Sequence, residues 1–291
     1  MKIGFIGTGL MGTPMIKNLI QSRNKVYVFN RTISKAKKLE KYGAILSCKI
    51  EQLVKNKNVI ITMLTDDKAV NQIIGSKKFL KNINKKTTVI DMSSTRPKTA
   101  FKNFKKLKKI GVNYLDAPVS GGTKGAESAN LAIMVGGEKK IFKKNLKTLK
   151  ILGNPNYVGN SSSGQAAKLA NQIIVGVTIG AVSEAILLCE KLGLNSLNVL
   201  KALEGGWADS KILQTHGLRM IKNDFKPRGK ISSQLKDMEN ILHTAKSYNL
   251  NLPLSKIIRN LYKQLSKKGY NNLDHSYLYK EIKKNLINCR E

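Results

Sequence analysis

The sequence predicts an α/β domain with a parallel sheet, followed by an all-α domain, with a long helix joining the two. Three observations predict this architecture. Short β-branched runs alternate with helical patterns in the first half, whereas no convincing strand follows residue 159. A long apolar run, residues 173–189, separates the two kinds of pattern. A chain of 291 residues is also long enough for two ordinary domains, which we place at residues 1–161 and 162–291.

The first domain is expected to hold six short strands with helices between most of them. Short strands separated by helices are typical of βαβ units, in which helices cover both faces of a parallel sheet. The expected strands are residues 2–6, 25–29, 58–63, 87–91, 113–116 and 131–135, and the expected helices are residues 11–21, 34–41, 66–74 and 97–110.

The second domain begins with the apolar run of residues 173–189, which we interpret as a buried helix of a soluble protein. The run is only about 17 residues long, at the lower limit for a transmembrane helix, and it contains Glu184. A helix that is apolar on all sides packs among other helices in a soluble protein, so no membrane partner is expected. Farther on, Gly205-Gly206 predicts a helix stop, with Trp207 as a packing aromatic. A core-facing helical stripe is predicted at Leu254, Ile257, Ile258, Leu261 and Leu265.

The chain is strongly basic, with 52 Lys and Arg against 18 Asp and Glu and a formal net charge of +34 at pH 7. Such a charge is typical of proteins that bind nucleic acids or anionic membranes. Only seven of the basic residues are arginines, however, and aromatic residues make up just 6% of the chain. Phosphate and base recognition favours clustered arginines with aromatic partners. We therefore expect a solvated lysine surface with no specific nucleic-acid partner, and polyanion binding is the alternative.

Cysteine and histidine positions indicate neither a disulfide framework nor a metal site. The cysteines are odd in number and far apart: Cys48, Cys189 and Cys289. The histidines lack metal-ligand spacing and read as structural residues: His216, His243 and His275. The first residues run directly into an expected strand without the layout of a cleavable signal, so we expect a reducing, cytoplasmic setting.

A glycine-rich turn, Gly7-Thr-Gly9-Leu-Met-Gly12, follows the first expected strand and opens the first helix. In that setting Gly7 permits a tight turn, Gly9 lets the backbone approach a pyrophosphate, and Gly12 allows close packing of helix on strand. Free N–H groups at the start of the helix then face the phosphates. The motif predicts a Rossmann-type dinucleotide site that includes Leu10 and Met11.

The end of the second expected strand favours NADP over NAD. NAD enzymes typically place Asp or Glu there to bind the ribose 2′-hydroxyl, whereas this chain has Asn30-Arg31-Thr32. Arg31 can pair with a 2′-phosphate, and Asn30 and Thr32 can donate hydrogen bonds to it. The alternative interpretation is an exposed basic turn.

Two further segments carry candidate substrate residues. Consecutive small residues at Ser120-Gly121-Gly122 leave backbone N–H groups unshielded, as in a nest that binds a carboxylate, although a flexible loop has the same composition.

The segment Gly159-Asn-Ser-Ser-Ser-Gly-Gln-Ala-Ala-Lys168 resembles the start of a P-loop, but Gln165-Ala166 stands where Lys-Ser/Thr is required. Its serines suit helix caps. Lys168 lies one turn into the helix, with Asn171 and Gln172 at i+3 and i+4. A lysine among alanines on a buried helix is unusual, and the alternative is a surface lysine.

Together these motifs resemble the β-hydroxyacid dehydrogenase family, which includes 3-hydroxyisobutyrate dehydrogenase and 2-hydroxy-3-oxopropionate reductase. The resemblance implies an NAD(P)-dependent oxidoreductase that transfers a hydride between the nicotinamide and a small β-hydroxy acid or semialdehyde carrying a carboxylate. The matching motifs, in the family's order, are Gly4-Phe-Ile-Gly-Thr-Gly-Leu-Met-Gly12, Asp91-Met-Ser-Ser-Thr95, Asp116-Ala-Pro-Val-Ser-Gly-Gly122, Asn130-Leu-Ala-Ile-Met-Val-Gly-Gly137, Gly164-Gln-Ala-Ala-Lys168 and Leu235-Lys-Asp237.

For the substrate, the resemblance implies that Lys168 is the catalytic residue. It implies that Ser120, Gly121 and Gly122 bind the substrate carboxylate and that Asn171 helps to position the substrate. A homodimer or homotetramer formed through the helical domain is expected.

For the cofactor, the resemblance implies that Lys236 reaches the nicotinamide end and that Asp237 orients it. Without the resemblance, this adjacent pair would read as a solvated ion pair. The cofactor cleft would be lined by Met63, Leu64 and Thr95.

Two positions depart from the family pattern. Many members carry Asn where this chain has Gln172, so the resemblance leaves open whether Asn171 or Gln172 contacts substrate. Trp207 stands where relatives often have Phe, which suggests a reshaped pocket. Within the enzyme class, a glyoxylate/succinic semialdehyde reductase is the alternative; outside it, the alternative is a non-catalytic polyanion-binding relative.

Overall fold

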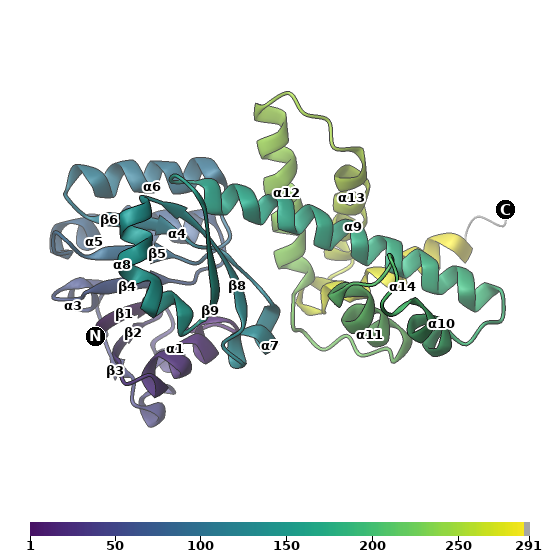
Figure 1. Cartoon of the computed structure of the whole chain (residues 1–291), viewed down its shortest axis with the longest axis horizontal. Coiled ribbons are helices and arrows are strands. Elements are labelled where there is room, and N and C mark those ends of the chain that lie inside the picture. Colours follow the sequence, from purple (N-terminus) through teal and green to yellow (C-terminus); the bar gives the residue numbers. More distant parts are fainter. Residues whose placement is uncertain (288–291) are drawn as a thin grey trace. The chain divides into compact units, whose positions relative to one another are not determined.

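The computed structural model describes residues 1–287, and the chain divides into two compact units within one long helix. The first unit comprises residues 1–168 and the second begins at residue 169. The first unit is an α/β domain and the second is helical (Figure 1), as the sequence predicts. Of the cysteines, Cys48 and Cys189 are free thiols, and Cys289 lies outside the described residues.

The first unit is built on one nine-stranded sheet with the order β3-β2-β1-β4-β5-β6-β8-β7, and β9 pairs with β8. Strands β1 to β6 all run parallel. Strand β8 runs antiparallel to β6 and β7 and parallel to β9. The strands are β1 (Lys2–Ile6), β2 (Lys25–Phe29), β3 (Ile45–Leu46), β4 (Val59–Thr62), β5 (Thr88–Asp91), β6 (Asn113–Asp116), β7 (Val119–Ser120), β8 (Leu131–Gly137) and β9 (Gly153–Gly159).

The sheet is therefore mostly parallel, as predicted, and β8 is the strand that departs from this pattern by running antiparallel to β6 and β7. Between β6 and β8 the chain forms only the two-residue β7 and the six-residue helix α7 (Gly122–Glu127). A parallel crossover has to return to the edge where β6 began, usually along a full helix. The chain turns back instead at the edge where β6 ends. Strand β9 was not predicted because its sequence, GNPNYVG, is rich in residues that are rare in strands.

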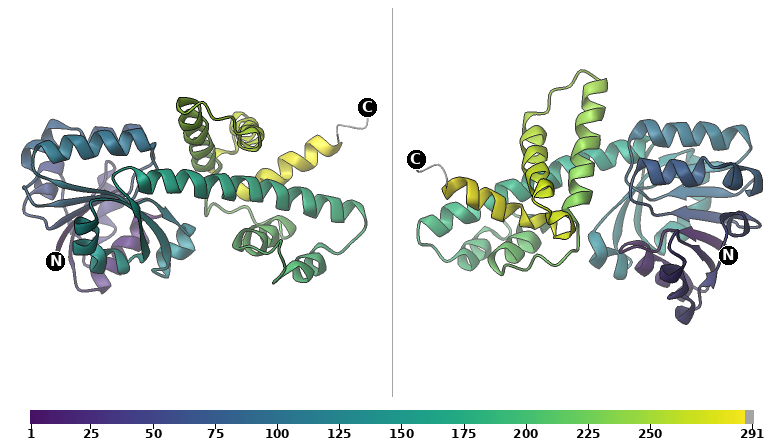
Figure 2. Two further views of the ribbon diagram at one scale, coloured as in Figure 1. Left: turned by 45° about the horizontal axis from the view of Figure 1, so that its top comes forward. Right: turned by 180° about the vertical axis from the view of Figure 1, so that it is seen from behind.

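Apolar side chains of the sheet divide between two hydrophobic clusters. Val59 and Ile61 belong to one cluster, whereas Ile60, between them on β4, belongs to the other. Successive side chains of a strand point to opposite faces, so both faces of the sheet are buried. Figure 2 shows helices on both sides. Besides α7, the helices of this unit are α1 (Gly12–Gln21), α2 (Ile33–Lys37), α3 (Ile50–Val54), α4 (Asp67–Ile74), α5 (Lys77–Asn82), α6 (Pro97–Lys109) and α8 (Lys139–Lys150), with a 3₁₀ turn at Glu40–Tyr42.

The second unit is built from helices joined by loops, with no named strand among its described residues, and includes most of the long helix α9 (Ser163–Lys191). Among the described residues, α9 is the one helix that is long and apolar enough to cross a membrane, and 44% of its most apolar window is buried. Its Ile179, Val182 and Ile186 lie in the hydrophobic core of this unit. The other elements are α10 (Ser196–Leu203), a π-helical turn at Leu213–Gly217, α11 (Leu218–Ile221), α12 (Ile231–Ser247), α13 (Pro253–Lys267) and α14 (Leu278–Ile287), with 3₁₀ turns at Tyr270–Asn272 and His275–Tyr277.

Two predictions of packing in the helical unit are wrong. Leu254 and Ile257 are 61% and 57% exposed, although the helical stripe predicts them in the core. The buried face of α13 is centred on Ser255, Ile258, Tyr262 and Leu265, so Leu254 and Ile257 lie beyond its margin. Trp207 is fully exposed rather than packed.

Candidate active site

The glycine-rich turn lies between β1 and α1, and two of its glycines have no room for a side chain. Gly7 has a φ of +106°, and its N–H donates to the carbonyl oxygen of Phe29 at 3.0 Å. A Cβ on Gly7 would lie 2.2 Å from the carbonyl oxygen of Met63, and one on Gly12 would lie 2.0 Å from the carbonyl oxygen of Gly7. Packing of the protein itself therefore requires these two glycines.

Gly9 differs, because a Cβ there would meet no atom within 4 Å. The protein's own packing does not require a glycine at this position, which lies directly before α1. The helix begins at Gly12, and no side chain caps its first turn. Open space in front of uncapped N–H groups fits the pyrophosphate of a dinucleotide. In the same loop, Leu10 is exposed and Met11 is half-buried.

At the end of β2, the side chain of Asn30 braces two loops. Its Oδ1 accepts a hydrogen bond from the N–H of Thr8 at 3.2 Å, and its Nδ2 donates to the carbonyl oxygen of Thr32 at 3.0 Å. The amide oxygen and one N–H of Nδ2 are thus engaged within the protein, so the predicted donation from Asn30 to a phosphate would come from the second N–H. Arg31 and Thr32 are exposed beside it.

The ends of β4 and β5 bring the remaining predicted cofactor residues of the first unit to the same edge of the sheet. Met63 and Leu64 follow β4 and are half-buried, and the Leu64 N–H donates to Ser93 Oγ at 2.9 Å. Thr95, after β5, is fully buried, and its Oγ1 has no hydrogen-bond partner in the described part of the chain. An unpartnered buried hydroxyl is costly, so its presence fits a ligand that completes the site.

Gln165 fastens the loop after β5 to the first turn of α9. Its Oε1 accepts from the N–H of Thr95 at 3.0 Å, and its Nε2 donates to the carbonyl oxygen of Ser93 at 2.8 Å. The sequence assigns Gln165 no structural role, although the residue is part of the Gly164–Lys168 motif. Its structural role depends on a segment some 70 residues earlier, which sequence spacing does not reveal.

Asp116, at the end of β6, caps the first turn of α9. Its carboxylate accepts from the N–H groups of Ser162 at 2.8 Å and Gln165 at 2.9 Å. The prediction that nearby serines cap this helix is therefore wrong for these two groups. Burial raises the pKa of Asp116 to about 7, although both hydrogen bonds oppose that shift. Gly164 is required here, because a Cβ would lie 2.3 Å from the Asp116 carbonyl oxygen.

Lys168 lies one turn farther along α9 and is buried, with 7% of its surface exposed. The alternative of a surface lysine is therefore wrong. Taking an ammonium group out of water is costly, and such a group is retained where its charge or its proton is used. The contacts of Asp116 and Gln165 fix the turn of helix that carries it.

Ser120 and the two glycines after it lie where β7 passes into α7. Ser120 pairs with Ala132 of β8 and is half-buried. Gly121 and Gly122 are exposed and have φ values of +136° and +61°, a conformation that side chains rarely adopt. The turn keeps its backbone accessible, as a carboxylate nest requires.

In the second unit, Gln172 is buried and both ends of its amide are engaged. Its Oε1 accepts from Asn171 Nδ2 at 2.8 Å, and its Nε2 donates to Asp237 Oδ2 at 2.6 Å and to Gln234 Oε1 at 3.2 Å. Asp237 also lies 3.0 Å from the Nζ of Lys236. With 5% of its surface exposed, Asp237 is not part of a solvated pair. Sequence reasoning missed Gln234, which only folding brings beside Gln172.

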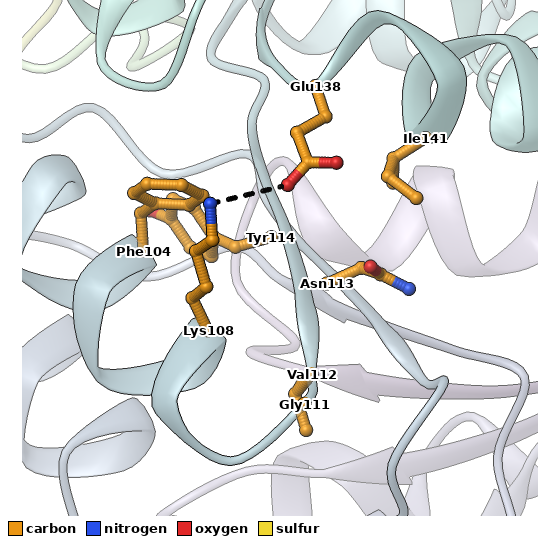
Figure 3. A pocket seen from close by; sticks show the side chains of 8 residues that line it. All are labelled: Phe104, Lys108, Gly111, Val112, Asn113, Tyr114, Glu138 and Ile141. Carbon is orange, nitrogen blue, oxygen red and sulfur yellow. Dashed lines mark ion pairs between the residues drawn. The ribbon is translucent and has the colours of Figure 1, made fainter.

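A pocket elsewhere in the first unit lies at the opposite end of β6 (Figure 3). It is lined by Asn113 and Tyr114 at the start of that strand, by Phe104 and Lys108 of α6, and by Glu138. Lys108 and Glu138 lie 4.0 Å apart across it. Open α/β sheets bind ligands at the carboxyl ends of their strands. The candidate active site is therefore at the other edge.

Comparisons with known proteins cover nearly the whole chain. Residues 2–176 match the NAD-binding domain of 6-phosphogluconate dehydrogenase, and residues 162–282 match the NAD-binding domain of NADP-dependent 3-hydroxyisobutyrate dehydrogenase. The chain is 39% identical over 285 residues to 2-hydroxy-3-oxopropionate reductase of Escherichia coli K12, with 97% of each chain covered.

Two further relatives are also a reductase and a dehydrogenase. Glyoxylate/succinic semialdehyde reductase 1 of Arabidopsis thaliana is 30% identical, with 97% of this chain and 99% of the relative covered. The structure of Mycobacterium tuberculosis 3-hydroxyisobutyrate dehydrogenase with L-serine superposes with a TM-score of 0.89 at 27% identity, covering 97% of this chain and 98% of the other.

Proposed function

The chain belongs to the β-hydroxyacid dehydrogenase family, and from this premise we propose that it interconverts a small β-hydroxy acid and its semialdehyde, of the 2-hydroxy-3-oxopropionate type. It is an NAD(P)-dependent oxidoreductase. The observation that carries the proposal is the buried Lys168, held one turn above the carboxyl edge of the sheet by the contacts of Asp116 and Gln165. The 30% identity to a glyoxylate/succinic semialdehyde reductase supports the alternative substrate class.

In the proposed mechanism, Lys168 acts on the substrate oxygen. The nicotinamide, when bound, supplies the hydride that adds to the carbonyl carbon. Negative charge then develops on the carbonyl oxygen, where the Lys168 ammonium stabilises it and donates a proton, leaving a neutral amine. In the oxidation direction the neutral amine removes the hydroxyl proton.

We propose two kinds of substrate contact, a backbone nest for the carboxylate and a side-chain amide. We assign the carboxylate to the turn at Ser120, Gly121 and Gly122. Asn171 lies three residues from Lys168 on α9, so the two share one helix face. Because both ends of the Gln172 amide are engaged within the protein, we propose that Asn171 contacts the substrate and that Gln172 orients Asn171.

For the cofactor, we propose that NADP(H) is preferred over NAD(H). Support comes from the absence of a carboxylate after β2 and from the exposed Arg31 guanidinium at that position. The phosphate would be bound by Arg31 and Thr32, while Asn30 braces the loop that carries them.

The proposed function is tested with a panel of semialdehydes and hydroxy acids, assayed by nicotinamide absorbance with both cofactors. We expect the highest kcat/KM with 2-hydroxy-3-oxopropionate and NADPH. Highest kcat/KM with succinic semialdehyde or glyoxylate would establish the alternative substrate class. No turnover of any panel member would reject this substrate range.

We also propose that the enzyme is a cytoplasmic homodimer or homotetramer formed through the helical unit. Support comes from a stripe of apolar residues along one face of α9 and into the turn directly after it, which would pack against a second copy. Ile174, Leu188 and Leu192 in it are 62% to 67% exposed. The stripe comprises Ala170, Ile174, Ala181, Ala185, Leu188 and Leu192.

Placing charges on this stripe is expected to separate the copies. In light scattering after size exclusion, Ile174→Lys combined with Leu188→Lys should shift the mass to that of one chain, because buried lysines at an apolar interface are unpaired. Ile45→Lys, at an exposed position on edge strand β3, is the matched control and should leave the mass unchanged. An unchanged mass in the double variant would place the interface elsewhere.

A further inference from the structure

Two histidines that are far apart in the sequence meet in the helical unit. His216 lies in the π-helical turn and His275 begins the last 3₁₀ turn. Their Nε2 atoms are 2.8 Å apart, and His275 Nδ1 lies 3.4 Å from Oε1 of Gln234. The same Oε1 accepts a hydrogen bond from Gln172. A chain of polar contacts thus runs from the histidine pair to the amide that orients Asn171.

The contacts determine where the protons lie. Gln234 Oε1 can only accept, so His275 Nδ1 carries a hydrogen and, in the neutral ring, His275 Nε2 accepts from His216. His216 Nδ1 then has a lone pair, and it is buried with no hydrogen-bond partner in the described part of the chain. Burial first, and then the neighbouring His275 and Arg219, lower the pKa of His216. His216 therefore stays neutral at physiological pH.

Asp274 lies beside this pair, and the three side chains resemble a metal site in composition. Its carboxylate is already engaged, however, because it accepts from the N–H groups of Arg228 and Gly229 and from Ser276. The Arg219 guanidinium, 3.5 Å away, opposes a cation. Asp274 therefore holds the backbone at Arg228 and Gly229 in place and is not a metal ligand.

The backbone of His275 is held in place on both sides. Its N–H donates to the carbonyl oxygen of Gly229 at 2.7 Å, and its carbonyl oxygen accepts from the hydroxyl of the fully buried Tyr262 at 3.0 Å. The imidazole therefore projects from a rigid support. Gln234, in contrast, lies on α12 with its Nε2 buried and unpartnered within the described residues, so its Oε1 contacts decide its orientation.

We propose that His275 is a positioning residue of the active site. By donating to Gln234 Oε1, it holds that oxygen toward Gln172 Nε2, and Gln172 in turn presents Asn171 to the substrate. The inference rests on the proposed function only in assigning Asn171 to the substrate. His275 itself touches neither substrate nor cofactor in this assignment, so its loss should weaken substrate binding more than it slows the chemical step.

The kinetic test replaces His275 with leucine, which keeps the approximate volume but removes the donor. We expect the KM for the semialdehyde to rise about tenfold, with kcat and the KM for NADPH changed less than about threefold, since the loss of one hydrogen bond to Gln234 Oε1 costs up to about that much in affinity. His275→Asn places an amide N–H near the position of Nδ1 and should restore the KM to within about threefold of wild type. His243→Leu, at an exposed histidine on α12, is the control and should change neither parameter.

A wild-type KM in His275→Leu, or a failure of His275→Asn to restore the KM, would overturn the proposal. If the leucine variant does not fold, Gln234→Met removes the acceptor of His275 together with its bond to Gln172 while leaving the histidine pair intact, and a rise in KM of at least the same size is expected.

A readout independent of activity separates this inference from the proposed function. Long-range ¹H–¹⁵N spectra of histidine-labelled enzyme should show His275 protonated at Nδ1, with that signal shifted in Gln234→Met. Protonation at Nε2 alone would overturn the inference even if the enzyme turns over every predicted substrate. If no panel substrate is turned over, the proposed function fails while the spectra still decide the contact.

Discussion

Replacing Lys168 with alanine is expected to lower kcat at least 10²-fold and up to about 10⁴-fold, the range of general acid–base assistance. The substitution removes the proton donor and the positive charge that faces the developing alkoxide. It leaves the glycine-rich turn and Arg31 unchanged, so NADPH affinity, measured by fluorescence of the bound cofactor, should change little. In the oxidation direction, the limb of the pH–rate profile that reflects deprotonation of Lys168 should disappear.

The matched control for this variant is Lys191→Ala, which removes an exposed lysine at the other end of α9. It should retain wild-type kcat, because its ammonium is solvated and lies six turns of helix away. A Lys168→Ala enzyme that keeps more than about a tenth of wild-type kcat on its best substrate would fall outside the acid–base range. Lys168 would then be a binding residue at most.

The second large effect is expected at Arg31, after β2. The wild type should prefer NADPH to NADH by more than about tenfold in kcat/KM, because a charge-assisted bond to the 2′-phosphate contributes about 1.5 kcal/mol or more. Arg31→Asp should reverse this order, since a carboxylate repels the phosphate and accepts a hydrogen bond from the ribose 2′-hydroxyl of NADH. Initial rates with each cofactor measure both changes.

Arg23→Asp provides the control, because Arg23 is an exposed arginine just before β2, at the opposite end of the strand from Arg31. The same change of charge there should leave the cofactor ratio within about twofold of wild type, since it lies beyond a Debye length of screening from the site. Equal use of NADPH and NADH by the wild-type enzyme would refute the assignment to Arg31.

Features that depend on neighbouring residues were predictable from the sequence. The glycine-rich turn, the alternation of strands with helices, and the switch to a helical second unit all follow from backbone preferences over a few residues. The structure confirms this fold class, and the comparisons confirm the family. The steric need for Gly7 and Gly12 also agrees with the turn that the motif predicts.

Features that depend on how distant segments meet were not predictable. Whether Leu254 and Ile257 are buried is decided by which face of α13 finds neighbours, and their hydropathy alone indicates a core. The direction of β8 is decided by the edge of the sheet at which the chain turns back. In both cases a local pattern fits two arrangements equally well, and packing selects one.

The sequence by itself determined the family and predicted the catalytic candidate Lys168 and the cofactor turn, because these lie in contiguous motifs whose geometry is local. Only the tertiary structure decided how those residues are held. Asp116 caps α9 from a strand that ends 46 residues before Ser162, Gln165 reaches the loop after β5, and His275 reaches Gln234 across 41 residues. Hydrogen bonds between such distant positions produce no periodic pattern in the sequence. Each one depends on how the chain folds between the two residues that it joins.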